Sequence, residues 1–201
     1  MHRFNRQIDS HKRTLIKFSV VVSLYFFAFA SNVSANGNWI PIVQPPETGS
    51  SRAMLETSDG IYVGTSSGLY FSANQSKSWQ LMTEQSVVVS SLIETSNKQI
   101  MIGTYRGGLM KFSPKTKQIK VVGITDAFYI NGLVSIGNTL FATSFSRDGD
   151  AGVYFSKDNG DNWLATNFLE KMVWSLSSPD GKSLYAGTQS GLFVSTNLGE
   201  T

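Results

Sequence analysis

The fold is decided by a stretch that recurs along the chain, IYVGTSSGLYFS at residues 61–72. It returns as IMIGTYRGGL at residues 100–109 and as LYAGTQSGLFVS at residues 184–195. A looser copy begins with LFAT at residues 140–143 and rejoins the pattern with GVYFS at residues 152–156. Each copy joins two apolar runs through Gly-Thr and a second Gly, which indicates two strands and a tight turn.

The copies keep a common register. Gly64 and Gly103 are 39 residues apart, and Ala142 follows after another 39. Gly187 follows Ala142 by 45 residues, because the loose copy carries six extra residues between Thr143 and Gly152. A period of about 40 residues indicates one supersecondary unit per copy, stacked on its neighbours.

Four short β runs make up the second repeat: residues 87–94, 99–104, 108–113 and 118–122. The second run of each repeat is continuously apolar rather than alternating, which is typical of a strand covered on both faces. The sequence therefore predicts an all-β fold, a β-propeller of four-stranded blades with about four blades present. The repeats occupy about residues 44–82, 87–122, 128–166 and 173–201.

The first 35 residues have the composition of a secretory signal peptide. Residues 1–17 carry five Lys or Arg and one acid, and residues 18–30 carry no charge. Small residues offer cleavage sites at AFA (residues 28–30) or VSA (residues 33–35). A membrane anchor is the alternative, but a spanning helix needs about 20 apolar residues. We therefore expect cleavage near Ala35, export to the periplasm or the extracellular space, and no membrane span in the mature chain.

Removing this segment changes the charge and the available chemistry. The chain has 17 Lys or Arg and 14 Asp or Glu, whereas residues 36–201 keep 12 and 13, a net charge of −1. We therefore expect no nucleic-acid partner. Both histidines, His2 and His11, precede residue 36, and the chain has no Cys. Ser-His-Asp and Cys-His catalysis and the usual zinc sites are thus excluded, and we expect no catalytic residue, metal or cofactor.

One hairpin carries a more specific motif. SKDNGDNW at residues 156–163 fits Ser-x-Asp-x-Gly-x-x-Trp in every defined position. SANQSKSW at residues 72–79 is a weakened copy, STNLGET at residues 195–201 stops one residue before its Trp, and SPKTK at residues 113–117 lacks the pattern. The motif resembles the Asp-box, or BNR repeat, of sialidase-like propellers. We assign a structural role to Ser72, Asn74, Trp79, Ser156, Asp158, Gly160, Trp163, Ser195, Asn197 and Gly199.

That role has a physical basis in the hairpin. Asp or Asn accepts backbone N–H bonds, Gly supplies a left-handed turn, and Trp packs beside the blade.

The resemblance extends over residues 39–201 and includes several families. Sialidases also carry an Arg-Ile-Pro signature, and WIPI at residues 39–42 lacks its arginine. Xyloglucanase-type glycoside hydrolases have similar blades, with two aspartates as acid and base. Exported assembly factors of the photosystem II stability-factor type are equally similar and have no chemistry. The second repeat is similar to the sensor propellers of bacterial two-component regulators.

The number of blades stays open at this point. Residues 38–43, NWIPIV, look like an outer strand that can complete the last blade and close a four-bladed ring. The resemblance instead implies six to eight blades, and seven would need about 280 residues. We therefore expect the chain to be the first part of a larger propeller, with the four-bladed ring as the alternative.

Candidate binding residues lie in the turns between second and third strands, opposite the Asp-box turns. Here the repeats differ, and loops that vary on a rigid scaffold are where function usually lies. The candidates are Tyr105, Arg106, Arg147, Asp148 and Gln189, with Glu84, Asp126, Tyr129, Glu170 and Lys171 in nearby connections. Aromatic, Arg and carboxylate side chains suit a polar or saccharide ligand.

Two functions compete. We predict an exported, non-catalytic binding, assembly or sensor propeller, with a protein or carbohydrate ligand on the face opposite the Asp-boxes. The alternative is a glycoside hydrolase of sialidase or xyloglucanase type. Asp148 and Asp150 are too close in sequence to straddle a glycosidic bond at about 5–9 Å. They also fall far short of the six or more oxygen ligands that Ca²⁺ takes.

Overall fold

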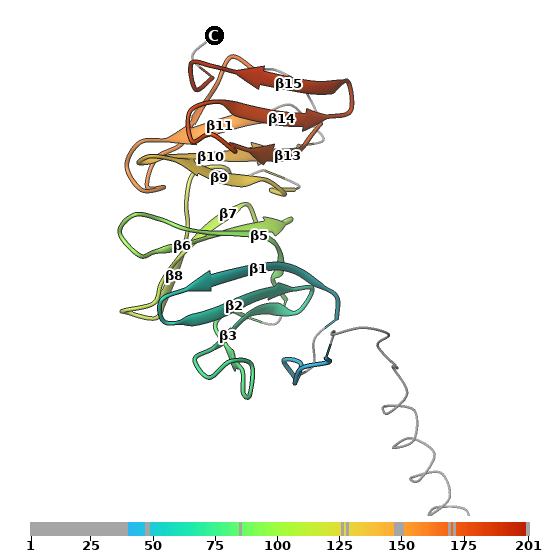
Figure 1. Cartoon of the computed structure of the whole chain (residues 1–201), viewed down its shortest axis with the longest axis vertical. Helices are drawn as coiled ribbons and strands as arrows, with labels where there is room; N and C mark the ends of the chain where they lie inside the picture. The colour runs from blue at the N-terminus through green and yellow to red at the C-terminus, as the bar shows by residue number, and fades with distance from the viewer. Residues whose placement is uncertain are drawn as a thin grey trace, which may run out of the picture. The chain divides into compact units, whose positions relative to one another are not determined.

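The computed structural model describes the chain from residue 40 to residue 199 with short gaps (Figure 1). The described residues are 40–46, 49–84, 86–125, 127, 129–146, 151–168, 170 and 172–199. All regular structure among them is β, in fifteen strands. In this part of the chain no helix is long and apolar enough to cross a membrane. The expected signal peptide, residues 1–35, lies outside the described residues, so its cleavage stays a prediction.

The strands of the unit Ile42–Thr201 form four antiparallel sheets, each from one continuous stretch of chain in up-and-down order. The first contains β1 (Ser51–Thr57), β2 (Gly60–Thr65), β3 (Gly68–Ser72) and β4 (Gln80–Leu81). The second contains β5 (Val88–Glu94), β6 (Ile100–Tyr105), β7 (Leu109–Ser113) and β8 (Gln118–Val121). The third contains β9 (Leu133–Ile136), β10 (Thr139–Ser144), β11 (Gly152–Ser156) and β12 (Leu164–Ala165). The fourth contains β13 (Val173–Ser177), β14 (Leu184–Thr188) and β15 (Gly191–Ser195).

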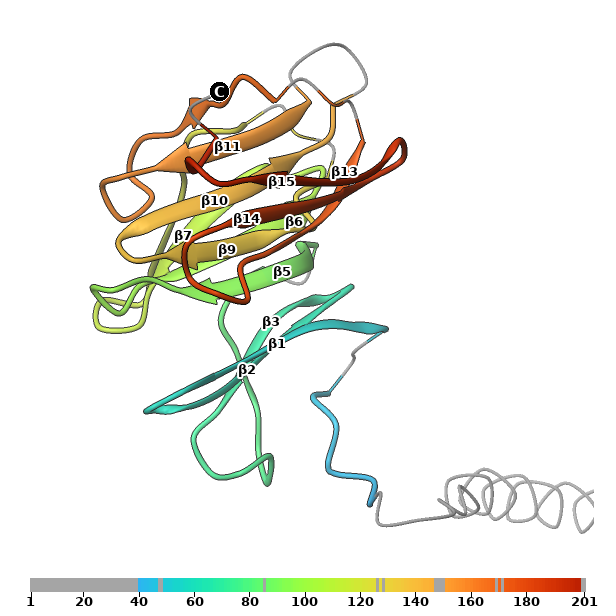
Figure 2. The same ribbon diagram turned by 45° about the horizontal axis from the view of Figure 1, so that its top comes forward.

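Consecutive sheets pack face to face in a row. Strand β1 packs against β5, β5 against β9, and both β9 and β10 against β13. In Figures 1 and 2 the first sheet lies at one end of the row and the fourth at the other. The predicted all-β propeller architecture is confirmed, and the fourth blade has three described strands.

The segment expected to be an outer strand has a different role. Residues 40–45 contain no strand. Val43 instead lies beside the first sheet, where Trp79 Nε1 donates a hydrogen bond to its carbonyl at 2.8 Å. Val43 therefore contacts the first blade, and residues 42–43 pair with no described strand of the fourth.

The central strands are buried on both faces because a sheet covers each side. Along β6, Ile100 and Ile102 join the apolar cluster shared with the first sheet. Met101, between them, joins the cluster shared with the third sheet. All three side chains are at most 1% exposed. The continuous apolar run seen in the sequence is thus two alternating faces, each belonging to a different core.

The Gly-Thr-x-x-Gly motif closes the turn between second and third strands through its threonine. Thr104 Oγ1 donates to the Gly108 carbonyl at 2.7 Å and accepts from the Gly107 N–H at 3.0 Å. Equivalent bonds occur at Thr65 and Thr188. The turn is therefore held by a side-chain hydroxyl as well as by glycine.

The first and second glycines of the Gly-Thr-x-x-Gly motif have different structural roles. Gly108 has φ +69°, the left-handed region expected of a turn glycine. Gly103 lies within β6, where a Cβ atom would collide with the Ile130 carbonyl. The first glycine thus permits close approach of the next blade. The sequence had instead suggested that it serves the tight turn between the two strands.

None of the described strands packs on the outer face of the fourth sheet. Leu192 of β15 occupies the repeat position of Leu69 and Leu109. Those two side chains are 0% exposed, whereas Leu192 is 75% exposed. The same residue type at the same repeat position therefore has two different environments.

We expect Leu109→Ala to lower the free energy of unfolding by about 2–5 kcal/mol, because it removes buried methyl groups and leaves a cavity. Leu192→Ala, the matched control, should change it by less than about 0.5 kcal/mol. Urea denaturation of both variants measures the difference. Equal losses would show that Leu192 is covered in solution.

Candidate functional site

The two ends of the sheets carry different kinds of loop. We call one end the loop face: it holds the turns between second and third strands, at residues 66–67, 106–107 and 189–190, and the connections between sheets. We call the opposite end the turn face: it holds the hairpin turns between first and second and between third and fourth strands. The up-and-down order of each sheet separates these two sets of loops.

Three aromatic rings on the loop face form a ladder. Tyr105 ends β6, Tyr129 lies between β8 and β9, and Phe145 follows β10. The Tyr105 and Tyr129 ring centroids are 4.4 Å apart with a 27° interplanar angle, and those of Tyr129 and Phe145 are 6.3 Å apart. Backbone bonds between Tyr129 and Phe145, at 3.1 and 3.0 Å, hold the ladder together. All three rings are half-buried.

Arg106 extends the aromatic ladder at one end. Its guanidinium carbon lies 4.9 Å from the Tyr105 ring centroid, within cation–π range. Arg106 has φ +63°. Among the described residues it is the only non-glycine with a positive φ on the loop face, a conformation that costs roughly 1–2 kcal/mol.

The other expected ligand-binding residues are less closely associated. Gln189 is exposed in the turn of the fourth sheet, where its N–H donates to the Met172 carbonyl at 3.1 Å. Beside it, the Ser190 hydroxyl donates to Glu170 at 2.9 Å. Arg147 and Asp148 lie outside the described residues, as do Asp126 and Lys171. The structure thus brings Tyr105 and Arg106 together with Tyr129 and Phe145.

On the turn face, Asp158 organises the third–fourth strand hairpin of the third sheet. Its carboxylate accepts the Asn162 N–H at 2.9 Å, the Asp161 N–H at 3.1 Å and the Ser156 hydroxyl at 2.8 Å. Gly160 follows with φ +79°. The half-buried Trp163 packs against the core shared by the second and third sheets.

Two other sheets repeat this turn. Ser72 and Ser195 each donate a hydroxyl hydrogen bond to the Asn two residues later, at 3.0 Å and 2.9 Å. Gly199 repeats the positive φ of Gly160. In the second sheet, residues 113–117 form a different turn, in which the Lys117 N–H donates to the Ser113 carbonyl at 2.8 Å.

These hydrogen bonds alter the acidity of Asp158. The pKa of its carboxyl lies well below the usual range. The largest cause is the hydrogen bond donated by the Asn162 backbone N–H, followed by hydrogen bonds from the side chains of Asn162 and Ser156. The pKa of Asp161 is also lowered, first by hydrogen bonds from Lys111 and Lys120. Backbone N–H groups of Ser183 and Lys182 lower the pKa of Asp180 to about 2.

Carboxyl groups with a lowered folded-state pKa stabilise the fold above the unfolded-state pKa of about 3.9, and this contribution is lost as pH falls. We therefore expect the free energy of unfolding to decrease from pH 5 to pH 2 in urea denaturation. Asp158→Asn should flatten that dependence, because Asn74 already accepts the equivalent N–H bond in the first sheet. Glu56→Gln, at an exposed acid outside these turns, is the matched control. If the free energy of unfolding of Asp158→Asn depended on pH as steeply as that of the wild type, the assigned role of Asp158 would be contradicted.

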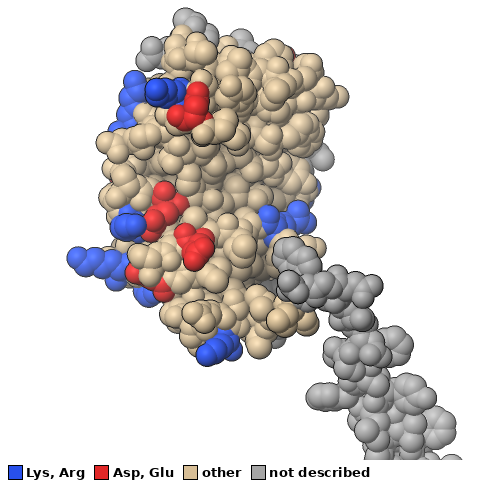
Figure 3. Space-filling view, viewed as in Figure 1, with Lys and Arg blue, Asp and Glu red and all other residues tan. Residues whose placement is uncertain are grey.

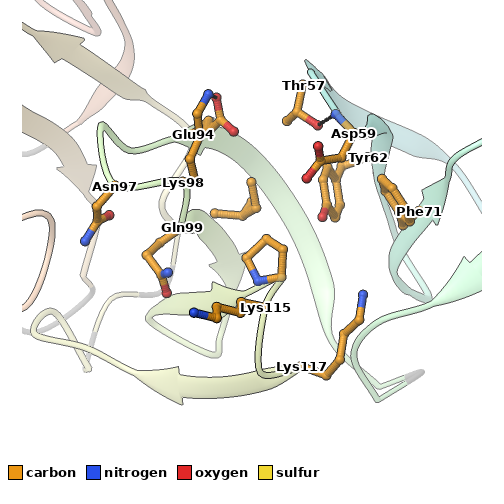
Figure 4. Close-up of a pocket in the computed structure, with 12 residues that line it drawn as sticks. Thr57, Asp59, Tyr62, Phe71, Glu94, Asn97, Lys98, Gln99, Lys115 and Lys117 are labelled. Carbon is orange, nitrogen blue, oxygen red and sulfur yellow. Dashed lines mark hydrogen bonds and ion pairs between the residues drawn. The ribbon is translucent and has the colours of Figure 1, made fainter.

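A pocket of about 450 Å³ opens on the turn face between the first and second sheets (Figure 4). We call it the interblade pocket. It combines aromatic and apolar side chains with lysines and carboxylates. Its lining residues are Thr57, Asp59, Tyr62, Phe71, Glu94, Asn97, Lys98, Gln99, Ile100, Pro114, Lys115 and Lys117.

Sequence reasoning missed this pocket because its residues come from two repeats. Asp59, Tyr62 and Phe71 belong to the first sheet, whereas Glu94 and the lysines belong to the second. One signal was present: the turn at residues 113–117 departs from the motif that the other three repeats share. That departure places Lys115 and Lys117 at the rim of the pocket.

Charged side chains are interspersed over the surface. In the view of Figure 3, acidic groups lie near basic ones at the top and on the left, and other basic groups lie apart from any acid, with uncharged areas between them. Among the described residues, no three His, Cys, Asp or Glu side chains are close enough to hold a metal ion.

Comparisons with known proteins support the fold. No protein-family model matches the chain, and no curated protein matches it. The extracellular domain of BT4673 from B. thetaiotaomicron is similar, with a TM-score of 0.60 and 22% identity over 73% of this chain and 21% of that one. An ancestral GH74 enzyme is also similar, with a TM-score of 0.59 and 20% identity over 80% of this chain and 25% of the enzyme.

A bacterial surface component is also similar. PorZ of the type-IX secretion system of Porphyromonas gingivalis has a TM-score of 0.55 and 14% identity, over 73% of this chain and 24% of PorZ. The chain thus spans about a fifth to a quarter of the length of these three proteins. At these identities, the likeness is one of fold.

Proposed function

We propose that the chain is an exported, non-catalytic propeller module that binds a protein or carbohydrate through its loop face. The observation that carries this proposal is the aromatic ladder of Tyr105, Tyr129 and Phe145 with Arg106 at its end. Extracellular and surface locations of similar structures support export. The basic segment and apolar run before residue 36 support it independently.

The ladder is suited to a ligand with flat, weakly polar faces. Half-buried rings offer apolar area without an entropic penalty for ordering, because neighbouring rings and backbone bonds already fix them. Arg106 adds a planar donor that can pair with a carboxylate or sulfate at roughly 1.5–3 kcal/mol for each charge-assisted bond. A saccharide bearing an acidic group, or a protein surface with an exposed carboxylate, has this chemistry.

The backbone of Arg106 also favours a role in binding. A residue that keeps a positive φ in a turn already containing Gly107 and Gly108 retains a strained conformation where glycine would relieve it. We therefore assign Arg106 as the principal ligand contact, with Arg147, Asp148 and Gln189 as further contacts from neighbouring turns.

We also propose that the turns at Ser72, Ser156 and Ser195 are Asp-boxes with a structural role. Their shared side-chain bonds support this assignment. A glycoside hydrolase is the second candidate, supported by likeness to a GH74 enzyme. It requires two carboxylates about 5–10 Å apart, and release of reducing sugar from xyloglucan by the purified protein tests it.

Arg106→Gly tests the loop face. A glycan array and a pull-down from periplasmic extract identify the ligand, and the variant should then bind it about tenfold more weakly or worse. The melting temperature should stay the same or rise, because glycine relieves the left-handed conformation. The matched control is Lys157→Gln on the turn face, which should bind normally. Full affinity in Arg106→Gly with loss in Lys157→Gln would place the ligand on the other face.

Export has its own test. We expect the chain to accumulate outside the cytoplasm with an N-terminus near Asn36, because the basic and apolar segments before it are those of a signal peptide. Mass spectrometry of periplasmic and secreted fractions measures the N-terminus. An intact Met1, or residence in the cytoplasm, contradicts this proposal.

A further inference from the structure

The hydroxyl of Tyr62 lines the interblade pocket. Tyr62 is 2% exposed, and its ring packs 4.6 Å from the Phe71 ring centroid. Figure 4 shows its hydroxyl end pointing into the pocket. No described residue hydrogen-bonds to this hydroxyl, which leaves it available to a ligand in the pocket. Burial raises the pKa of the Tyr62 hydroxyl most, and the negative charges of Asp59 and Glu94 raise it further. The hydroxyl therefore stays protonated and can donate a hydrogen bond.

Two lysines give one side of the pocket a positive charge. The Lys117 ammonium lies 5.9 Å from the centroids of both the Phe71 and Phe112 rings. Among the described residues, neither Lys115 nor Lys117 has a carboxylate within ion-pair distance. Their ammonium groups are therefore available to an anion that enters the pocket.

The other side of the pocket offers hydrogen-bond acceptors. Asp59 lies in the turn between β1 and β2, and Glu94 at the end of β5 pairs with Lys98 at 3.0 Å. Figure 4 shows both acids across the pocket from Lys115 and Lys117. A ligand spanning the pocket thus meets carboxylates at one side and ammonium groups at the other, with the Phe71 ring between them.

We infer that the interblade pocket binds an acidic monosaccharide unit, a hexuronic acid. Its carboxylate would pair with Lys115 and Lys117, and its hydroxyls would bond to Tyr62 and Asp59. The less polar face of its ring would lie on Phe71. A volume of about 450 Å³ falls within the range of small-ligand pockets and accommodates one sugar ring.

The second repeat explains why the site occurs between these two blades. The other three repeats carry the Ser-x-Asp/Asn motif after their third strand, whereas the second carries Pro114, Lys115 and Lys117. The turn therefore contributes two cations to the pocket. Lys117 has φ +59°, a left-handed conformation that this turn imposes on a lysine.

Isothermal titration of the purified protein with glucuronate, and with glucose as the uncharged analogue, tests the inference. Glucuronate should bind at least about tenfold more tightly than glucose, since each charge-assisted bond is worth more than a neutral one. Raising the salt concentration should weaken glucuronate binding and leave glucose binding unchanged. Absence of glucuronate binding, or equal binding of the two sugars, would overturn the proposal.

Variants locate the binding. The double variant Lys115→Gln/Lys117→Gln should reduce glucuronate affinity about tenfold or more, to the level of glucose, and Tyr62→Phe should reduce it severalfold by removing only the hydroxyl. Lys77→Gln, in the corresponding turn of the first sheet, is the matched control. Lys77→Gln should keep full affinity. Wild-type affinity in the double variant, or an equal loss in Lys77→Gln, would show that glucuronate binds elsewhere.

Discussion

Each blade depends on having a neighbour, because its central strand is apolar on both faces. In β6 the alternation is strict: Ile100 and Ile102 lie in one core and Met101 in the next. Strand β10 repeats this arrangement, with Leu140 and Phe141 in different cores. No single sheet can bury such a strand, so the stability of a blade comes from the contact between blades rather than from the sheet alone.

Local hydrogen bonds at the ends of the sheets hold the turns, so that the residues of some turns can differ between repeats. Thr104 and its equivalents hold the turns on the loop face through short-range hydrogen bonds, and Asp158 or Asn74 does so on the turn face. Because these turns stabilise themselves, Arg106 can occupy an unfavourable conformation without disrupting β6 and β7. Likewise, the second blade can replace the Ser-x-Asp turn with a lysine-rich one.

The sequence was sufficient to predict the strands and the sheets, since both follow from local apolar patterns and a repeat of about 40 residues. It also placed Tyr105, Arg106 and Tyr129 near one face. It was not sufficient for the stacking of Tyr105 on Tyr129 or for the interblade pocket, because those contacts depend on how adjacent sheets are rotated and spaced. It also assigned residues 38–43 to an outer strand, whereas Val43 bonds to Trp79 instead.

The exposed outer face of the fourth sheet has a consequence for local opening. Blades that contact only their immediate neighbours behave as a one-dimensional chain, in which the cost of opening a unit depends on how many neighbours it has. The sheet of β13–β15 has one neighbour among the described residues, and β6 lies in a sheet with two. Amide hydrogens of β14 will therefore exchange with solvent through openings that leave β6 protected, and exchange rates will rank the blades by position in the row.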